Sequence, residues 1–255
     1  MVTNSKSESY KKLCTEYYEL DKPFAPNEAM NYYLTMAKEA EGPILEPMCG
    51  TGRFLIPLIE AGYNVAGFDN SAQMLDVCRS KCQEKKLNVK LKKCGFEDFT
   101  LSETFNLVFI PSGSFCLLTD PNDSSNALNL INKWLSVGGK FIFEIDTLNA
   151  AGTTPGMWKA NWVKKADGSL IVLNHTGIFD EKTSIETVLC RYEQWKNNQI
   201  VQTEVEEFCL RLYSIQEIET LLSQHGFKIR NRLIPYSSEN ASENAESILF
   251  ECVKV

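Results

Sequence analysis

The amino-acid sequence predicts an α/β fold: a doubly wound, mostly parallel sheet of seven strands, with an antiparallel β insertion after the fifth strand. Three observations indicate this fold. Apolar runs of strand length alternate with segments of helical periodicity up to about residue 150, which is typical of a parallel sheet with crossover helices. Strand patterns then follow one another without helices between them from residue 151 to 213. Helix and strand patterns return after that and complete the sheet.

The N-terminal part of the chain is expected to be helical in two pieces. Leu13, Tyr17 and Leu20 have helical spacing, which predicts the first piece. Residues 22–26 contain two prolines and separate it from a second piece that ends near residue 40. Residues 1–40 therefore precede the sheet as a helical segment.

The alternating elements follow in order. We expect strands at residues 43–47, 63–68, 88–94, 105–110 and 140–146. We expect helices at residues 52–61, 71–86 and 121–136. Asn70 or Ser71 is placed to cap the second of these helices, and Pro121 lies in the tolerated first turn of the third. Gly138 and Gly139 are expected to end that third helix.

The insertion is expected to be a meander of three or four antiparallel strands. Turn signals at residues 166–168, 180–182 and 196–198 divide it. In the last strand the apolar positions change parity between Val205 and Phe208, which predicts a β-bulge near Glu206–Glu207.

The last part of the chain returns to helix and strand signals. Ser214 and Glu217 form a capping box at the start of a helix, and Gly226 ends that helix after His225. Strands at 227–233 and 247–254 are expected to close the sheet as an antiparallel pair.

The most informative motif is a strand, a glycine-containing turn and a helix in residues 44–54, ILEPMCGTGRF. Such a turn places backbone N–H groups and the positive end of a helix beside a small concave site. Asp69 ends the next strand, 17 residues after Gly52. An acidic residue about 20 residues past such a turn is placed to bind two ribose hydroxyls.

Two kinds of nucleoside cofactor could use this arrangement. A dinucleotide needs a third small residue after the turn, where this chain has Leu55. A bulky leucine there is expected to hold the helix away from the strand. Glu46 would repel a phosphate and attract an ammonium group. The ligand that fits has a ribose, an amine and a carboxylate but no phosphate, as S-adenosylmethionine has.

At these motifs the chain resembles the class I S-adenosylmethionine-dependent methyltransferases. EPMCGTGRF is similar to the first motif of that family, and FDNSAQML at 68–75 is similar to its second. FNLVFIPSGSF at 105–115 resembles strand four, and LSVGGKFIFEID at 135–146 resembles the Gly-Gly turn into strand five. The resemblance covers residues 36–150 and implies the fold, the cofactor and methyl transfer.

The resemblance also implies roles for the residues of the first two motifs. Glu46 would hold the amine of the cofactor, directly or through water, and the amides near Gly50 and Gly52 would face its methionine portion. Asp69 would bind both ribose hydroxyls. The adenine would be flanked by Asn70 and Met74.

The chain departs from the family pattern at the adenine. The family often has an acidic residue at the end of strand three, where this chain has Gly95. The backbone near Gly95 and Phe96 would then hold the adenine, with Glu97 or Asp98 as a substitute acceptor. Met48 stands where the first motif often has a further glycine. Ser112 follows strand four, where α/β sheets open their ligand crevice, and is a further expected contact.

The residues that contact a substrate are predicted from residue types in the lid, in the insertion and after strand four. By this resemblance, residues 1–40 would form a helical lid, residues 41–150 and 214–255 would form the cofactor-binding core, and residues 151–213 would cover the active site. Tyr17 and His175 are candidates for a catalytic proton acceptor. The residues expected to contact a substrate are Tyr18, Phe115, Trp158, Arg191 and Tyr192. Each of these side chains could instead pack in a helix or sheet core, or lie on the surface.

Composition limits the partners. The chain of 255 residues has 26 Lys and Arg against 33 Asp and Glu, a net charge of −7, so an extended nucleic-acid surface is not expected. Nine cysteines without a C-x-x-C pair and only two histidines give no metal site. Without a secretory signal or an apolar run of membrane length, we expect a cytoplasmic protein with free thiols and no membrane contact. An exposed edge of the insertion could form a homodimer.

These observations predict a methyltransferase that moves a methyl group from S-adenosylmethionine to nitrogen or oxygen of a small molecule by in-line displacement. The product cofactor would be S-adenosylhomocysteine. Three alternatives stay open: a non-catalytic cofactor-binding or interaction protein, a methyltransferase that acts on a protein, and an oxidoreductase with a nucleotide cofactor.

Overall fold

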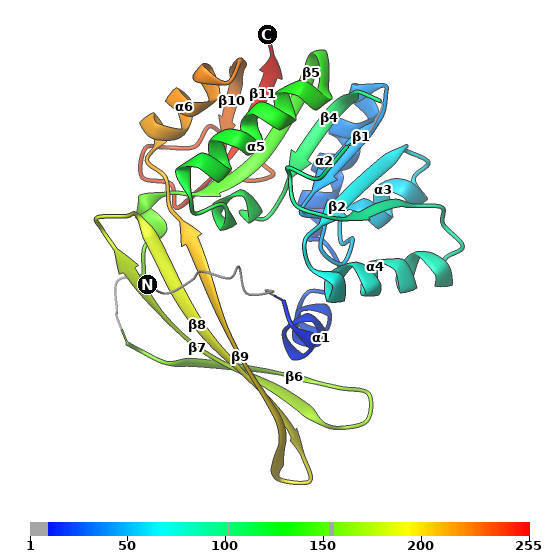
Figure 1. Ribbon diagram of the computed structural model, residues 1–255, viewed down its shortest axis with the longest axis vertical. Coiled ribbons are helices and arrows are strands. Elements are labelled where there is room, and N and C mark those ends of the chain that lie inside the picture. The colour runs from blue at the N-terminus through cyan, green and yellow to red at the C-terminus, as the bar shows by residue number, and fades with distance from the viewer. Residues whose placement is uncertain (1–9, 101–102, 153–155) are drawn as a thin grey trace.

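The computed structural model describes residues 10–100, 103–152 and 156–255. A seven-stranded sheet has the order β10-β11-β5-β4-β1-β2-β3 (Figure 1). β11 is antiparallel to β5 and β10, and the other neighbouring pairs are parallel, which confirms the predicted sheet. The strands are β1 Ile44–Pro47, β2 Val65–Asp69, β3 Lys90–Lys93, β4 Phe105–Ile110, β5 Leu135–Asp146, β10 Phe227–Leu233 and β11 Ser247–Lys254.

Helices cover both faces of this sheet. On one face lie α2 Asn27–Ala40, α3 Leu55–Glu60 and α4 Ala72–Glu84. On the other lie α5 Pro121–Trp134 and α6 Ile215–Gln224. Each helix buries its apolar face against the sheet, so the core lies in two layers (Figure 1). In the described ranges no helix is both long and apolar enough to cross a membrane.

Three of the predicted helix ends depend on local capping, and the structure confirms these three. Ser71 accepts a hydrogen bond from the N–H of Met74 at the start of α4. Ser214 accepts one from the N–H of Glu217 at 3.2 Å at the start of α6. Gly226, with φ +75°, follows His225, the C-cap residue of that helix. These ends could be predicted because a cap involves residues only three positions apart.

The expected end of the third helix is wrong. α5 ends at Trp134, and β5 already begins at Leu135, which pairs with Phe105 of β4. Gly138, with φ +75°, lies inside β5, and the β4–β5 register shifts between Phe105 and Leu107. A Cβ on Gly139 would lie 2.9 Å from the carbonyl oxygen of Ser136. The two glycines therefore permit a bend within a strand.

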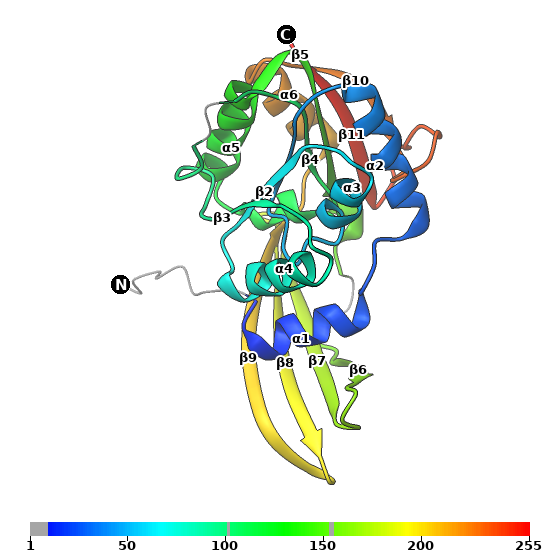
Figure 2. The same ribbon diagram turned by 90° about the vertical axis from the view of Figure 1, so that its right-hand side faces the viewer.

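The insertion forms a second sheet with the strands in sequential antiparallel order. They are β6 Lys159–Lys164, β7 Leu170–Asp180, β8 Ile185–Lys196 and β9 Gln199–Arg211. This sheet extends away from the main sheet, below the carboxyl ends of its parallel strands (Figures 1 and 2). Thr147 and Tyr213, where the chain leaves and re-enters the main sheet, form a parallel bridge.

The predicted bulge near Glu206–Glu207 is wrong. Glu206 pairs with Cys190 and Glu207 with Leu189 in continuous register, and the one shift lies between Gln194 and Trp195. The change of parity has another cause. The face of β9 that turns toward the N-terminal helix carries Glu204 and Glu206, so polar residues occupy inward positions there.

α1, Lys12–Asp21, lies between the insertion sheet and α4 (Figure 2). Leu13 and Cys14 pack with Ile171 and Cys190 in one buried cluster. In the described part of the expected N-terminal segment, residues 10–40, the first helix therefore connects the insertion sheet with α4. The first nine residues of that segment lie outside the described part of the chain.

Candidate active site

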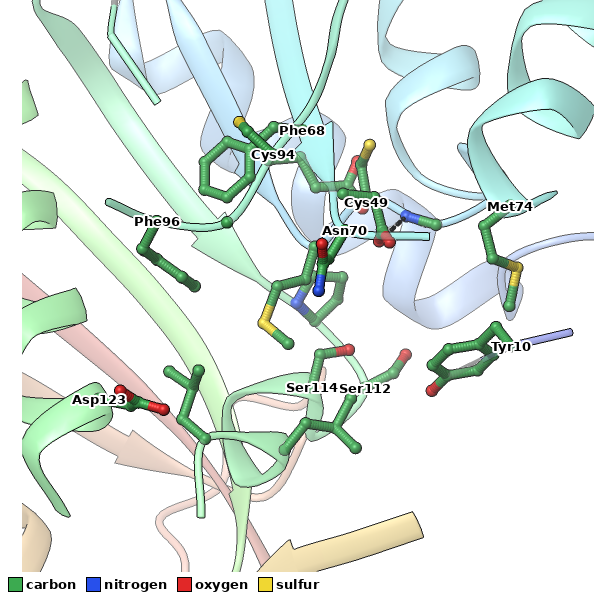
Figure 3. A pocket seen from close by; sticks show the side chains of 18 of the residues that line it. Tyr10, Cys49, Phe68, Asn70, Met74, Cys94, Phe96, Ser112, Ser114 and Asp123 are labelled. Carbon is green, nitrogen blue, oxygen red and sulfur yellow. Dashed lines mark hydrogen bonds between the residues drawn. The ribbon is translucent and has the colours of Figure 1, made fainter. Parts of the chain in front are cut away.

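A cavity of about 630 Å³ opens at the carboxyl ends of β1, β2 and β4, beneath α1 and beside β9. Figure 3 shows part of its wall, with Asn70 and Met74 on one segment and Phe96 on another. The structure brings ten of the residues predicted from the sequence to this cavity. They are Tyr18, Glu46, Gly50, Asp69, Asn70, Met74, Gly95, Phe96, Glu97 and Ser112.

The two glycines of the first motif have different surroundings. Both have positive φ, +53° at Gly50 and +78° at Gly52, which a turn between strand and helix requires. A Cβ on Gly50 would meet no atom within 4 Å, and Gly50 lines the cavity. A Cβ on Gly52 would lie 2.6 Å from the sulfur of Cys78, so Gly52 permits close packing on α4 and does not line the cavity.

Asp69 is fixed by backbone donors. The N–H of Gly50 donates to its Oδ2 and the N–H of Ser71 to its Oδ1, each at 2.8 Å. Desolvation raises the pKa of Asp69, and these N–H groups lower it again in part. Each carboxylate oxygen has a second acceptor position. The side chain is therefore oriented and can accept two hydroxyl groups side by side.

Glu46 is the least solvated acid of the cavity. It is 2% exposed, and its Oε2 has no hydrogen-bond partner among the described residues. Burial raises the pKa of Glu46 well above its usual range, against the attraction of Arg53. A buried carboxylate without a full set of partners is costly, and a cationic ligand group would remove that cost.

Arg53 lines the cavity and contacts two of its other wall residues. Its guanidinium lies 5.5 Å from the ring centre of Tyr18 and donates to Ser112 Oγ at 2.8 Å. Ser112 has φ +58°, and its N–H donates to Glu144 at 2.7 Å. Tyr236 also donates to Glu144. This network holds the loop after β4 in an unusual conformation at the cavity wall.

The part of the cavity near Gly95 has an aromatic wall residue. The ring of Phe96 stacks on Trp134 with centroids 6.0 Å apart. A Cβ on Gly95 would meet no atom within 4 Å, so there is space beside this backbone. Glu97 is exposed, and Asn126 donates to it at 3.3 Å. A planar ring could lie against the backbone of Gly95 between Phe96 and Met74.

Three predicted substrate-side residues lie in the protein core. Tyr17 and Tyr192 are buried against each other, with ring centroids 5.7 Å apart. Phe115 is fully buried and packs on Phe143 and Tyr213. None of the three lines the cavity. Residue type alone does not predict whether such a side chain faces the cavity or the core. In these three cases the side chain packs against apolar neighbours in the core.

The other three candidates are on the insertion, away from the cavity. Trp158 is half exposed, and the guanidinium of Arg191 lies 5.7 Å from its ring centre. Arg191 also pairs with Glu193. His175 lies in β7 opposite Cys190, and its Nδ1 is buried without a hydrogen-bond partner in the described residues.

Several wall residues were not expected from the sequence. These are Tyr10, Leu117–Thr119, Asp123, Asn126 and Glu207–Cys209. The rule that ligands bind beyond the carboxyl ends of parallel strands applies to the segment after β4 and could have indicated the first residues of α5. No local signal marks the β9 residues, because their place depends on how the insertion folds back.

The wall carries negative charge. Six carboxylates line it, from Glu46, Asp69, Glu97, Asp98, Asp123 and Glu207. Arg53 is the single basic side chain among the described lining residues. The described ranges contain no group of three or more His, Cys, Asp or Glu side chains placed for a metal ion. The cavity therefore favours ligands with positive charge.

One part of the argument against a dinucleotide is wrong. Leu55 does not hold α3 away from β2, because Gly67 of β2 leaves room for it. A Cβ on Gly67 would lie 2.5 Å from Leu55 Cδ1. The unfavourable position of Glu46 for a phosphate is unaffected by this correction.

Comparison with known proteins gives three kinds of similarity. Residues 44–139 match the family model described as "Methyltransferase domain". The putative methyltransferase YqeM of Bacillus subtilis (strain 168) is 24% identical over 246 residues, 96% of this chain and 97% of YqeM.

Two crystal structures share the fold at 18% sequence identity. An S-adenosylmethionine-dependent methyltransferase from Clostridium acetobutylicum ATCC 824 superposes with a TM-score of 0.79, over 94% of this chain and 96% of that one. The sugar N-methyltransferase KedS8 from Streptoalloteichus sp ATCC 53650 gives 0.72, over 89% and 87%.

Proposed function

Since the chain is a class I S-adenosylmethionine-dependent methyltransferase, we propose that it methylates a nitrogen or oxygen atom of a small molecule, with an amine as the favoured acceptor. The carboxylates of the cavity wall support an amine, because they favour a cationic acceptor over an anionic one. KedS8, which has the same fold, is a sugar N-methyltransferase. The proposal rests mainly on one observation. Buried Glu46 and Asp69, which backbone N–H groups hold in place, line the same cavity.

The residues present fit S-adenosylmethionine. Glu46, with an oxygen that lacks a partner, would hold the ammonium group. The open backbone at Gly50 would face the methionine portion, and Asp69 would accept both ribose hydroxyls. Phe96 and Met74 would flank the adenine. These assignments follow from burial, missing partners and space in the cavity.

The bound cofactor supplies an electrophilic methyl group on sulfur, and the protein supplies alignment and exclusion of water. Tyr10 and Tyr18 line the cavity on the α1 side and would shield it from solvent. The loop at Ser112, which Arg53 and Glu144 hold, would fix the wall next to the acceptor. Glu207 on β9 would orient an amine by charge. An amine held as its cation must release a proton, to solvent or to a wall carboxylate, before its lone pair can attack the methyl group.

The cofactor is tested first, by the thermal shift of the purified protein with S-adenosylmethionine, S-adenosylhomocysteine and NAD. We expect stabilisation by the two sulfur compounds and not by NAD. The variant Asp69→Ala should lose that stabilisation. Asp76→Ala, on the exposed side of α4, is the matched control and should keep it. A shift with NAD alone, or none with either sulfur compound, would contradict the proposal.

The acceptor is tested next, with pairs of small molecules that differ only in an amine or a hydroxyl at one position. Formation of S-adenosylhomocysteine and of a methylated product, both followed by mass spectrometry, should be faster with the amine of each pair. Faster turnover of the hydroxyl partners would refute the preference for nitrogen. Turnover of a protein in place of every small molecule would refute the proposed substrate class.

A further inference from the structure

The first turn of α1 has no cap from its own sequence. Lys11 is the N-cap residue, and its side chain makes no capping hydrogen bond. The first turn contains no acidic residue, and Lys12 opens it. Positive charge at this end is unfavourable to a helix, because the helix dipole already leaves the N-terminus positive. Residues 10–21 are therefore a weak helix when considered alone.

Two glutamates of β9 provide the missing cap. Glu206 accepts from the N–H groups of Tyr10, at 2.7 Å, and Lys11, at 2.9 Å. Glu204 accepts from the N–H of Leu13 at 2.7 Å. The amine of Lys11 donates to the carbonyl oxygen of Val205 at 3.0 Å. Three backbone donors at the start of α1 are thus satisfied by one strand that lies more than 190 positions later.

These carboxylates are unfavourable for the insertion sheet considered alone. Glu206 is 5% exposed, and Glu204 lies two residues before it on the same face of β9. Two acids on one inward face repel each other and lose hydration, and apolar residues there would make a more stable sheet. Their hydrogen bonds go to α1. The acids at these positions therefore stabilise the placement of α1 and not the insertion sheet itself.

The same helix covers the candidate active site. Tyr10 and Tyr18 line the cavity. The carbonyl oxygen of Tyr10 accepts from Ser71 Oγ at 3.3 Å, two residues after Asp69. Glu19 of α1 forms an ion pair with Lys81 of α4 at 2.9 Å. A shift of the first turn of α1 would therefore move one wall of the cavity.

We propose that Glu204 and Glu206 are positioning residues that fold the start of α1 and seat Tyr10 and Tyr18 over the cofactor. This inference rests on the proposed function for the identity of the ligand. It adds that cofactor affinity depends on two side chains of the insertion, although neither lines the cavity. β9 also contributes Glu207 and Phe208 to the wall, so one strand contacts both the lid and the space for the acceptor.

The test compares wild type with Glu204→Gln, Glu206→Gln and Glu206→Ala. Glu193→Gln is the control, since Glu193 is a buried acid of the same sheet that pairs with Arg191 and Trp195 and, among the described residues, makes no hydrogen bond or ion pair with α1. Hydrogen exchange by mass spectrometry follows the amides of residues 12–21 without ligand. Calorimetry gives the Kd for S-adenosylhomocysteine, and thermal unfolding reports the fold.

We expect α1 to exchange faster in the three variants, with α4 and α5 unchanged. The Kd should rise about ten-fold for Glu206→Ala, as expected when one charge-assisted hydrogen bond is lost. Glu206→Gln keeps a neutral acceptor and should show a smaller increase. The control should match wild type in both measurements.

Unchanged exchange of α1 would refute the capping role. Faster exchange with an unchanged Kd would refute the positioning role while leaving the proposed function intact. Wild-type protein that fails to bind S-adenosylhomocysteine would instead refute the proposed function and, with it, the link between α1 and the cofactor.

Discussion

At the scale of single residues, the chemistry of the cavity depends on acids that the protein holds out of water. Glu46 and Asp69 both have raised pKa values, because burial penalises their charged forms. These residues could be predicted from the sequence, since a strand, a turn and a second strand fix their relative positions. Phe115 and Tyr192 could not be placed in this way, because the faces they occupy depend on distant partners.

Glu46→Gln should stabilise the ligand-free protein and weaken cofactor binding. A neutral amide avoids the cost of a buried charge, so the Tm without ligand should rise at pH 7.5. Loss of a charge-assisted contact to the ammonium should raise the Kd about ten-fold or more. Thermal unfolding and calorimetry on the same sample check both effects. A lower Tm together with an unchanged Kd would contradict this assignment of Glu46.

Cofactor binding should release protons in the pH range of the raised pKa of Glu46. Burial favours the protonated form of Glu46 in the free protein, and a bound ammonium favours the ionised form. Affinity should therefore increase as pH rises through that pKa. Calorimetry in buffers of different ionisation enthalpy measures the proton count, which should fall to near zero in Glu46→Gln. An equal count in the two proteins would assign the protons elsewhere.

At the scale of elements, close packing of α3 on β2 depends on a glycine in the strand. Gly67 has no side chain where Leu55 and Cys49 pack. The sequence shows both the glycine and the leucine, but nothing local says that they meet. The helix caps are the opposite case, because Ser214 and Glu217 are neighbours in the chain. The cap of α1 resembles the case of Gly67, because it comes from β9 and could not be predicted from neighbouring residues.

Gly67→Ala should lower stability, whereas Gly95→Ala should lower cofactor affinity. A methyl group at Gly67 would overlap Leu55 Cδ1, so we expect a loss of about 1–3 kcal/mol in the free energy of unfolding. At Gly95 a methyl group meets no protein atom but enters the space expected for the adenine, so stability should hold while cofactor affinity falls. Urea unfolding and calorimetry separate the two. Equal losses of stability would contradict the packing described for both glycines.

Ser214→Ala should cost about 1 kcal/mol, because the N–H of Glu217 loses its acceptor at the start of α6. Ser223→Ala, at an exposed position near the end of the same helix, is the control and should be neutral. Urea unfolding measures both variants. A loss in the control as large as that in Ser214→Ala would show that the cap contributes nothing.

At the scale of the whole molecule, acids are concentrated at the junction of the two sheets. Glu144 and Asp146 at the end of β5, and Glu206 on β9, have pKa values raised by desolvation, as Glu46 and Asp69 do. The sequence predicted two sheets and the net charge of −7. It could not predict that the inward face of β9 is acidic, because alternation was read on apolar residues alone.

The ligand-free protein should be more stable at pH 5.5 than at pH 8. In the unfolded chain these five carboxyls titrate at about pH 4. The folded protein keeps their protons to higher pH, so the stability they contribute is fully present below that range and is lost as pH rises through the raised pKa values. Urea unfolding at the two pH values should show the lower free energy of unfolding at pH 8.

S-adenosylhomocysteine also carries an ammonium group and should reduce this pH dependence, because that cation compensates the charge of Glu46. The comparison is made by urea unfolding with and without the compound at both pH values. An increase in stability from pH 5.5 to pH 8 would contradict this prediction, because it would show that burial does not raise the free energy of ionising these acids.

The bridge between Thr147 and Tyr213 makes the insertion an exchangeable module. The chain leaves and re-enters the main sheet at neighbouring positions, where Tyr213 donates to the carbonyl oxygen of Asp146 and accepts from the N–H of Leu148. Evolution or a protein engineer can therefore replace the intervening sheet without altering the path of the core. A transplanted sheet brings a new acceptor wall, and it must also bring acids that can anchor α1.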